Sequence, residues 1–114
     1  MGEEYGGPEV LVVFCTCPDG ETATEIAEVL VAERLAACVN RLPRLTSVYL
    51  WQGKVARDTE SLLLIKTTRA RFEALRWRLS ELHPYELPEI IAIPVTLGLP
   101  AYLEWVSTCT ASDT

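Results

Sequence analysis

The order in which apolar spacings follow one another along the chain limits its fold more than any other feature. Residues 10–16 (VLVVFCT) form a continuous apolar run, typical of a buried strand, and residues 17–20 (CPDG) end it with a turn. Between residues 21 and 34 the apolar side chains instead recur three or four positions apart, which predicts an amphipathic helix. The chain therefore begins with a strand and a helix.

A hairpin of two strands is predicted next. Residues 38–51 have an extended pattern that is interrupted at Pro43, because proline cannot donate to a strand ladder. The pair Gln52–Gly53 favours a tight turn, and residues 60–68 (ESLLLIKTT) form the returning strand.

A second helix, a fourth strand and a closing helix complete the pattern. Residues 72–82 place their apolar side chains on one helical face, and this helix must end at His83 because Pro84 forces the preceding residue toward extended geometry. Residues 89–96 (EIIAIPVT) predict a strand, and residues 99–109 predict a short helix.

The order β-α-β-β-α-β indicates an α+β fold of the ferredoxin-like type, a four-stranded antiparallel sheet with both main helices on one face. A chain of 114 residues with 49% hydrophobic side chains can bury one core without metals or disulfides. We therefore predict one domain over residues 10–108, between a loose acidic N-terminal tail (1–9) and a C-terminal tail (109–114).

The predicted sheet has more apolar surface than two helices can cover. Tyr49 and Trp51 share one face of their strand and Val48 and Leu50 share the other, so neither face has the polar side chains expected of a solvated one. We therefore expect other copies of the chain to cover the second face. The alternative is that the segment from Leu99 onward folds over this face within one chain.

Charge and composition exclude several classes of partner. A net charge of -6 and a pI near 4.7 repel phosphate backbones and anionic lipids, so we expect neither nucleic acid nor membrane as a partner. No apolar run approaches the roughly 20 residues of a membrane span, and the N-terminus is unlike a signal peptide. Four cysteines are too few for a disulfide framework, which indicates free thiols and a cytoplasmic location. Arginine outnumbers lysine and amides are scarce, as a thermostable protein or a biased genome composition would give.

Five blocks of the sequence together resemble the CutA family of divalent-cation tolerance proteins, in the family's order and spacing. They are LAACVN (35–40), SVYLWQGKV (47–55), ESLLLIKT (60–67), HPYELPEIIAIPV (83–95) and YLEWV (102–106). The resemblance implies a ferredoxin-like subunit in a tight homotrimer similar to the PII signalling proteins. It also implies a role in tolerance of divalent metals.

Metal ligands are implied by the same resemblance. Carried over by position, a cysteine of the first strand and the histidine of the HPY block are Cys15 and His83, with Cys38 as a third candidate. Thiolate and imidazole suit copper and zinc better than carboxylates do, so we expect a divalent metal such as copper. The chain departs from some relatives at Leu82, where they have a second histidine, and at Gln52, where an acidic residue is common.

Each of these residues also has a structural interpretation. A free cysteine in apolar surroundings commonly serves as a small hydrophobic side chain, and His83 suits a helix end, where its charge complements the dipole. Nor does the chain carry a catalytic signature. Asn40–Arg41 is too little for an acylphosphatase-like site, and the acidic charge disfavours an RNA-recognition domain, so we predict that the protein is not an enzyme.

A second functional hypothesis is a PII-like trimeric scaffold or sensor that binds a small molecule or a partner protein in clefts between subunits. The polar and aromatic residues of the matching blocks that could line such clefts are Trp51, Glu60, Lys66, Tyr85 and Glu86.

Overall fold

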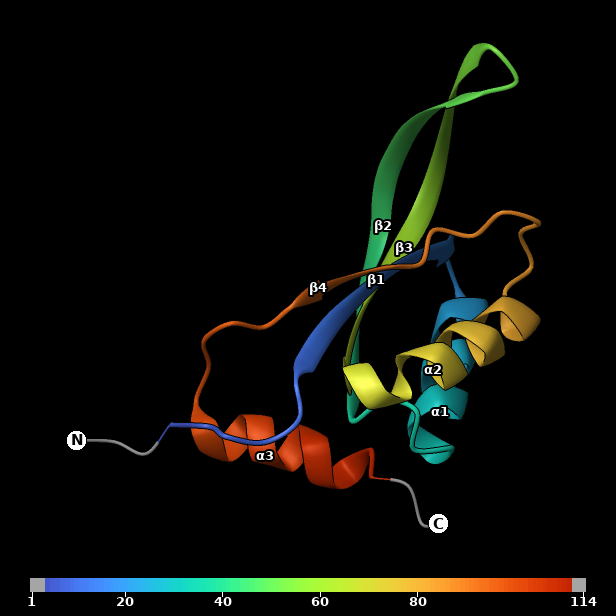
Figure 1. Ribbon diagram of the computed structural model, residues 1–114. Coiled ribbons are helices and arrows are strands. Elements are labelled where there is room, and N and C mark those ends of the chain that lie inside the picture. Colours follow the sequence, from blue (N-terminus) through green and yellow to red (C-terminus); the bar gives the residue numbers. More distant parts are fainter. Residues whose placement is uncertain (1–3, 112–114) are drawn as a thin grey trace.

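The computed structural model describes residues 4–111 and confirms the predicted order of elements (Figure 1). The elements are β1 (Val10–Pro18), α1 (Glu21–Ala32), β2 (Cys38–Trp51), β3 (Lys54–Thr68), α2 (Arg69–Leu82), β4 (Ile91–Pro94) and α3 (Pro100–Cys109). The strands form one sheet in the order β2-β3-β1-β4, and all neighbours are antiparallel. This is the α+β, ferredoxin-like arrangement expected from the sequence.

The bounds of three strands differ from the sequence prediction. β1 continues to Pro18 instead of ending at residue 16, because Cys17 and Pro18 still pair with β3. β3 begins at Lys54 rather than at residue 60, because its polar residues Arg57 and Asp58 still pair with β2. β4 is shorter than the predicted 89–96 and pairs with β1 only from Leu11 to Phe14. The end of β1 near Pro18 therefore extends beyond β4.

The core lies between the sheet and the two helices α1 and α2. Alternate residues of β1, Val13, Cys15 and Cys17, point toward the helices and are fully buried. They pack in one cluster with Leu30 of α1 and Leu79 of α2. This side of the sheet is closed within a single chain.

The opposite face of the sheet stays largely uncovered. α3 packs only at one end of the sheet, around Val10 and Ala37, as Figure 1 also shows. Leu42, Ile91 and Ile93 remain exposed. The alternative in which the segment from Leu99 buries this face alone is therefore wrong for the described chain, because α3 is too short and lies too far to one side.

The hairpin of β2 and β3 projects well beyond the rest of the subunit (Figure 1). Its turn uses two left-handed residues, Gln52 (φ 51°) and Gly53 (φ 78°), a conformation that matches the twist of the flanking strands. The hairpin exposes large apolar side chains on both faces, which are Val48, Leu50 and Val55 on one face and Tyr49 and Trp51 on the other.

The described ends of the chain pack against the domain. Tyr5 lies against the cluster around Val10, and the backbone N–H of Arg69 donates to the Glu9 carbonyl at 2.9 Å. The tails predicted at 1–9 and 109–114 fall partly outside the described residues, and the proposed domain limits stay a prediction. Within residues 4–111, all helices are too short or too polar to cross a bilayer.

A β-bulge bends the hairpin where it leaves the sheet. Pro43 and Arg44 of β2 both lie opposite Ser61 of β3, and Arg44 has a left-handed backbone (φ 54°). The Arg44 N–H, which has no ladder partner there, donates to Asp19 Oδ1 at 3.1 Å. The turn after β1 therefore holds the bulge in place.

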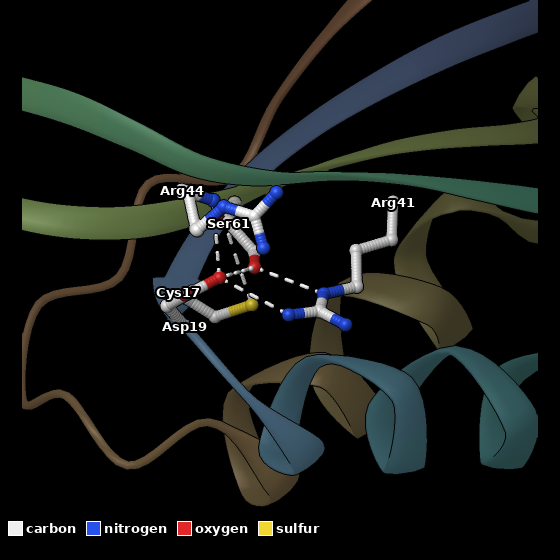
Figure 2. A network of polar contacts seen from close by, with 5 residues as sticks. All are labelled: Cys17, Asp19, Arg41, Arg44 and Ser61. Atoms are coloured by element: carbon white, nitrogen blue, oxygen red, sulfur yellow. Dashed lines mark hydrogen bonds and ion pairs between the residues drawn. The ribbon is translucent and has the colours of Figure 1, made fainter.

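Ser61 and Arg41 complete this network (Figure 2). The Ser61 hydroxyl donates to Asp19 Oδ1 at 2.7 Å and accepts from Arg41 Nε at 3.0 Å, and Arg41 Nη2 donates to the same carboxylate at 3.1 Å. The hydroxyl of Ser61, then the Arg44 N–H and the Arg41 guanidinium lower the pKa of Asp19. An ionised Asp19 therefore fixes the direction in which the hairpin projects.

We predict that Ser61→Ala lowers the free energy of unfolding by about 1–3 kcal/mol, because it removes the two hydrogen bonds of the buried hydroxyl to the charged groups of Arg41 and Asp19. Ser80→Ala is the matched control, since Ser80 is exposed on α2 and alanine favours the helix there. Urea unfolding of both variants measures the difference. Equal stabilities would contradict a stabilising role for the network.

Candidate functional site

The site starts at the free edge of β1, beyond the end of β4. Carbonyl groups of even-numbered residues on β1 point toward β4, as Val10 shows by accepting from the Val95 N–H at 2.9 Å. Residue 89 would continue this pairing opposite Thr16, but β4 begins only at Ile91. His83 takes the place of a strand residue there, and the Nε2 of His83 donates to the Thr16 carbonyl at 2.7 Å.

Both ring nitrogens of His83 are engaged. A carbonyl oxygen only accepts, so Nε2 carries the proton in the contact with Thr16. Nδ1 then has a free electron pair, and it accepts from the backbone N–H of Tyr85 at 3.1 Å. The ring is 6% exposed. His83 therefore joins the edge of β1 to the segment that follows α2.

Tyr85 carries this connection to β3. Its ring lies against the His83 ring, with centroids 4.7 Å apart, and its hydroxyl donates to Glu60 Oε2 at 2.8 Å. Glu60 is only 5% exposed. Burial raises the pKa of Tyr85, and the hydrogen bond to the Glu60 carboxylate raises it further. Three successive hydrogen bonds thus link Thr16, His83, Tyr85 and Glu60.

The structure brings Cys15 and His83 to the same atom. Cys15 Sγ lies 3.7 Å from the Thr16 carbonyl oxygen to which His83 also donates. Burial raises the pKa of the Cys15 thiol to about 12, and the negative charges of Cys17, Glu89 and Glu60 contribute to the shift. A metal that binds this sulfur must therefore displace a tightly held proton.

Cys38 lies elsewhere. It pairs with Lys66 and faces the uncovered side of the sheet, whereas Cys15 faces the helices. Thr16 pairs with Leu62, four residues away from Lys66 along β3, so Cys38 and Thr16 are separated by about 13 Å along the strand direction and also lie on opposite sides of β3. Within residues 4–111 no three or more His, Cys, Asp or Glu side chains are grouped to hold a metal ion. One chain thus supplies the pair Cys15 and His83, without Cys38.

An open groove of about 960 Å³ lies next to this pair, between the hairpin and the loop after α2. Its side chains are mainly acidic and aromatic, and they include Asp19, Asp58, Glu60, Glu86, Glu89, Tyr49, Trp51 and Tyr85. The hydroxyl of Tyr49 donates to Asp58, so a second tyrosine–carboxylate pair lies in the same groove. The groove suits neutral or cationic ligands better than anionic ones.

Four of the five residues predicted to line a cleft are in this groove, namely Trp51, Glu60, Tyr85 and Glu86. The fifth, Lys66, donates instead to Asn40 on the sheet. The role of the Thr16 carbonyl was not predicted, because a backbone acceptor has no sequence signature. Glu89 was not predicted as a groove residue either, although it belongs to the block that contains His83.

The chain is similar in sequence to proteins of one known family. The family model described as "CutA1 divalent ion tolerance protein" matches residues 11–109. The divalent-cation tolerance protein CutA of Thermus thermophilus is 54% identical over 95 residues, which cover 83% of this chain and 92% of that protein. Protein CutA of Mus musculus is 46% identical over 111 residues, and the match covers 97% of this chain but only 63% of the mouse protein.

The fold of the chain is also similar to solved structures of this family. The crystal structure of CutA from Xylella fastidiosa superposes with a TM-score of 0.87 at 51% identity, and the match covers 90% of this chain and 98% of that one. The hairpin, the loop after α2 and all three helices lie within the matched family region.

The raised pKa of Cys15 predicts a loss of stability at alkaline pH. In the unfolded chain the thiol has its ordinary pKa of 9.0, whereas burial in the folded chain raises the pKa to about 12. Stability is thus fully present below pH 9 and falls as the pH rises toward 12, by up to about 1.4 kcal/mol per pH unit.

Cys15→Ala should make this decline shallower, as measured by urea unfolding between pH 8 and about 10.5. Val13→Ala is the matched control because it truncates a buried neighbour on the same face of β1 without removing an ionisable group. If both variants kept the wild-type slope, ionisation of Cys15 would not limit alkaline stability.

Proposed function

The chain belongs to the CutA1 divalent ion tolerance family, and from this membership we propose that it is a non-enzymatic protein that binds a divalent metal such as copper through Cys15 and His83. The observation that carries the proposal is the meeting of Cys15 Sγ and His83 Nε2 at the Thr16 carbonyl oxygen. A sulfur and an imidazole nitrogen on one side of a strand are donors that copper prefers.

Binding has a chemical cost in this arrangement. The metal takes the place of the Cys15 proton, and His83 must release at least one of its two hydrogen bonds to offer a lone pair. The nearby carboxylates of Glu60 and Glu89 favour a cation at this end of β1, since both already act on the Cys15 thiol. We therefore propose a site that forms on metal binding and is pH-dependent.

We also propose that the protein is a homotrimer in the cytoplasm. An uncovered apolar sheet face and a hairpin exposed on both sides support assembly, because a soluble monomer rarely exposes so much contiguous apolar surface. Three copies, rather than another number, follow from the resemblance of the CutA family to PII proteins. Oligomeric contacts would cover the projecting hairpin and complete the domain.

A second candidate function is a PII-like sensor or scaffold. The groove of about 960 Å³ beside the hairpin supports it, because a cavity of this size is comparable with small-molecule sites. Its carboxylates disfavour nucleotides and favour a cationic or neutral ligand. In this case metal binding would be incidental.

Metal titration tests the first proposal. We expect Cys15→Ser and His83→Ala each to weaken copper binding at least tenfold, because each removes one of two protein ligands. Isothermal titration calorimetry of the whole protein at pH 7.5, with a competing chelator, measures the affinities.

Cys109→Ser is the matched control, since Cys109 lies on α3 against the cluster around Val10, away from this site. Wild-type affinity in the His83 variant would remove the histidine from the site. Thermal stabilisation by a diamine or metabolite but not by copper would favour the sensor.

The assembly can be tested on the hairpin. Leu50 and Trp77 are similarly exposed, at 71% and 67%, but Leu50 lies on the hairpin and Trp77 on the outer face of α2. We expect Leu50→Lys to lower the mass found by analytical ultracentrifugation from three chains toward one. Trp77→Lys should leave it unchanged, and a monomeric wild type at micromolar concentration would overturn the proposal.

A further inference from the structure

We infer that Tyr85 couples metal ligation at His83 to the acidic groove, so that the groove loses its Tyr85–Glu60 contact when a metal binds. This inference rests on the proposed function, since it concerns the same histidine. It depends on three contacts, which are the bond from His83 to the Thr16 carbonyl, the bond from the Tyr85 N–H to Nδ1, and the bond from the Tyr85 hydroxyl to Glu60.

Metal binding determines which nitrogen of the imidazole ring carries the proton. A neutral imidazole carries one proton, and a metal occupies a nitrogen that has none. If the metal binds Nδ1, it displaces the Tyr85 N–H directly. If it binds Nε2, which faces the Thr16 carbonyl near Cys15, the proton moves to Nδ1 and points at the Tyr85 N–H. Metal binding at either nitrogen therefore removes the acceptor of the Tyr85 N–H.

The neighbours of Tyr85 restrict how it can move. Pro84 restricts the backbone on one side, so the peptide of Tyr85 relieves the donor–donor clash by shifting away from the imidazole. The Tyr85 ring lies against His83 and moves with its backbone. Its hydroxyl is held by Glu60 at 2.8 Å, a contact that opposes the shift.

Loss of the Tyr85–Glu60 hydrogen bond favours metal binding at His83. Because the Tyr85–Glu60 bond stabilises the metal-free arrangement, removing it in advance makes ligation of His83 easier. Reciprocally, a ligand that draws Glu60 away from Tyr85 in the groove strengthens metal binding by the same factor. Tyr85 is thus a positioning residue that acts through His83.

The test is Tyr85→Phe, which removes the hydroxyl and keeps both the ring and the backbone N–H. Zn²⁺ is titrated into the whole protein by competition calorimetry, and we expect its affinity to rise about 2- to 10-fold, as loss of one hydrogen bond would give. Tyr49→Phe is the matched control. Its hydroxyl donates to Asp58 in the same groove but makes no contact with His83, so its affinity should equal that of the wild type.

A second measurement follows the coupling without using affinity. In ¹H–¹⁵N spectra of the wild type, Zn²⁺ should shift the amide signals of both Tyr85 and Glu60. In Tyr85→Phe the signal at position 85 should still shift, whereas the response at Glu60 should shrink. This pattern would support coupling through the hydroxyl, which a merely structural role of Tyr85 does not predict.

The outcomes separate this inference from the proposed function. If His83→Ala loses the metal but Tyr85→Phe binds it with wild-type or weaker affinity, the coupling is overturned and the metal site stands. If His83→Ala binds Zn²⁺ as tightly as the wild type, ligation by His83 is overturned, and the coupling is overturned with it.

Discussion

The whole architecture depends on a sheet that is apolar on both faces while only one face is covered by helices. The side of β1 that carries Val13 and Cys15 is closed by α1 and α2, and the burial of those residues accounts for the core of a single chain. The other side, together with the hairpin beyond the bulge, stays largely exposed in a single chain. In the proposed trimer, the other copies of the chain would complete this burial, and the direction of the hairpin would then be as important as the core.

That direction is set by polar contacts rather than by apolar packing. Asp19 binds the backbone of Arg44 at the bulge and the side chains of Ser61 and Arg41 beside it. These groups come from the turn after β1, from β2 and from β3, so the network joins three segments where the sheet ends and the hairpin begins (Figure 2). A carboxylate that stays ionised is suited to this task, because each of its partners is a donor.

Much of the fold could be predicted from the sequence because its signals are local. Helical spacing, Pro84 after α2 and Gln52–Gly53 at the turn act on neighbouring residues, and they gave the correct order of elements. The start of β3 was placed too late, since Arg57 and Asp58 pair in a ladder that lies outside the core and needs no apolar side chains. The Asp19 network was missed because its partners are more than 20 residues apart and meet only through strand register.

In the candidate site, too, the residues could be predicted from the sequence but the contacts between distant residues could not. The resemblance to the family singled out Cys15 and His83, but their meeting at one carbonyl oxygen depends on β4 beginning at Ile91 and leaving Thr16 without a strand partner. The structural and metal-binding interpretations of His83 are then not independent, because both use the same two nitrogens. The imidazole ring is held by its contacts with the Thr16 carbonyl and the Tyr85 N–H, and a metal that binds the ring would have to replace them. An imidazole engaged at both nitrogens is a ligand only in a second arrangement of its neighbours, and Tyr85 is the neighbour that must move in each case.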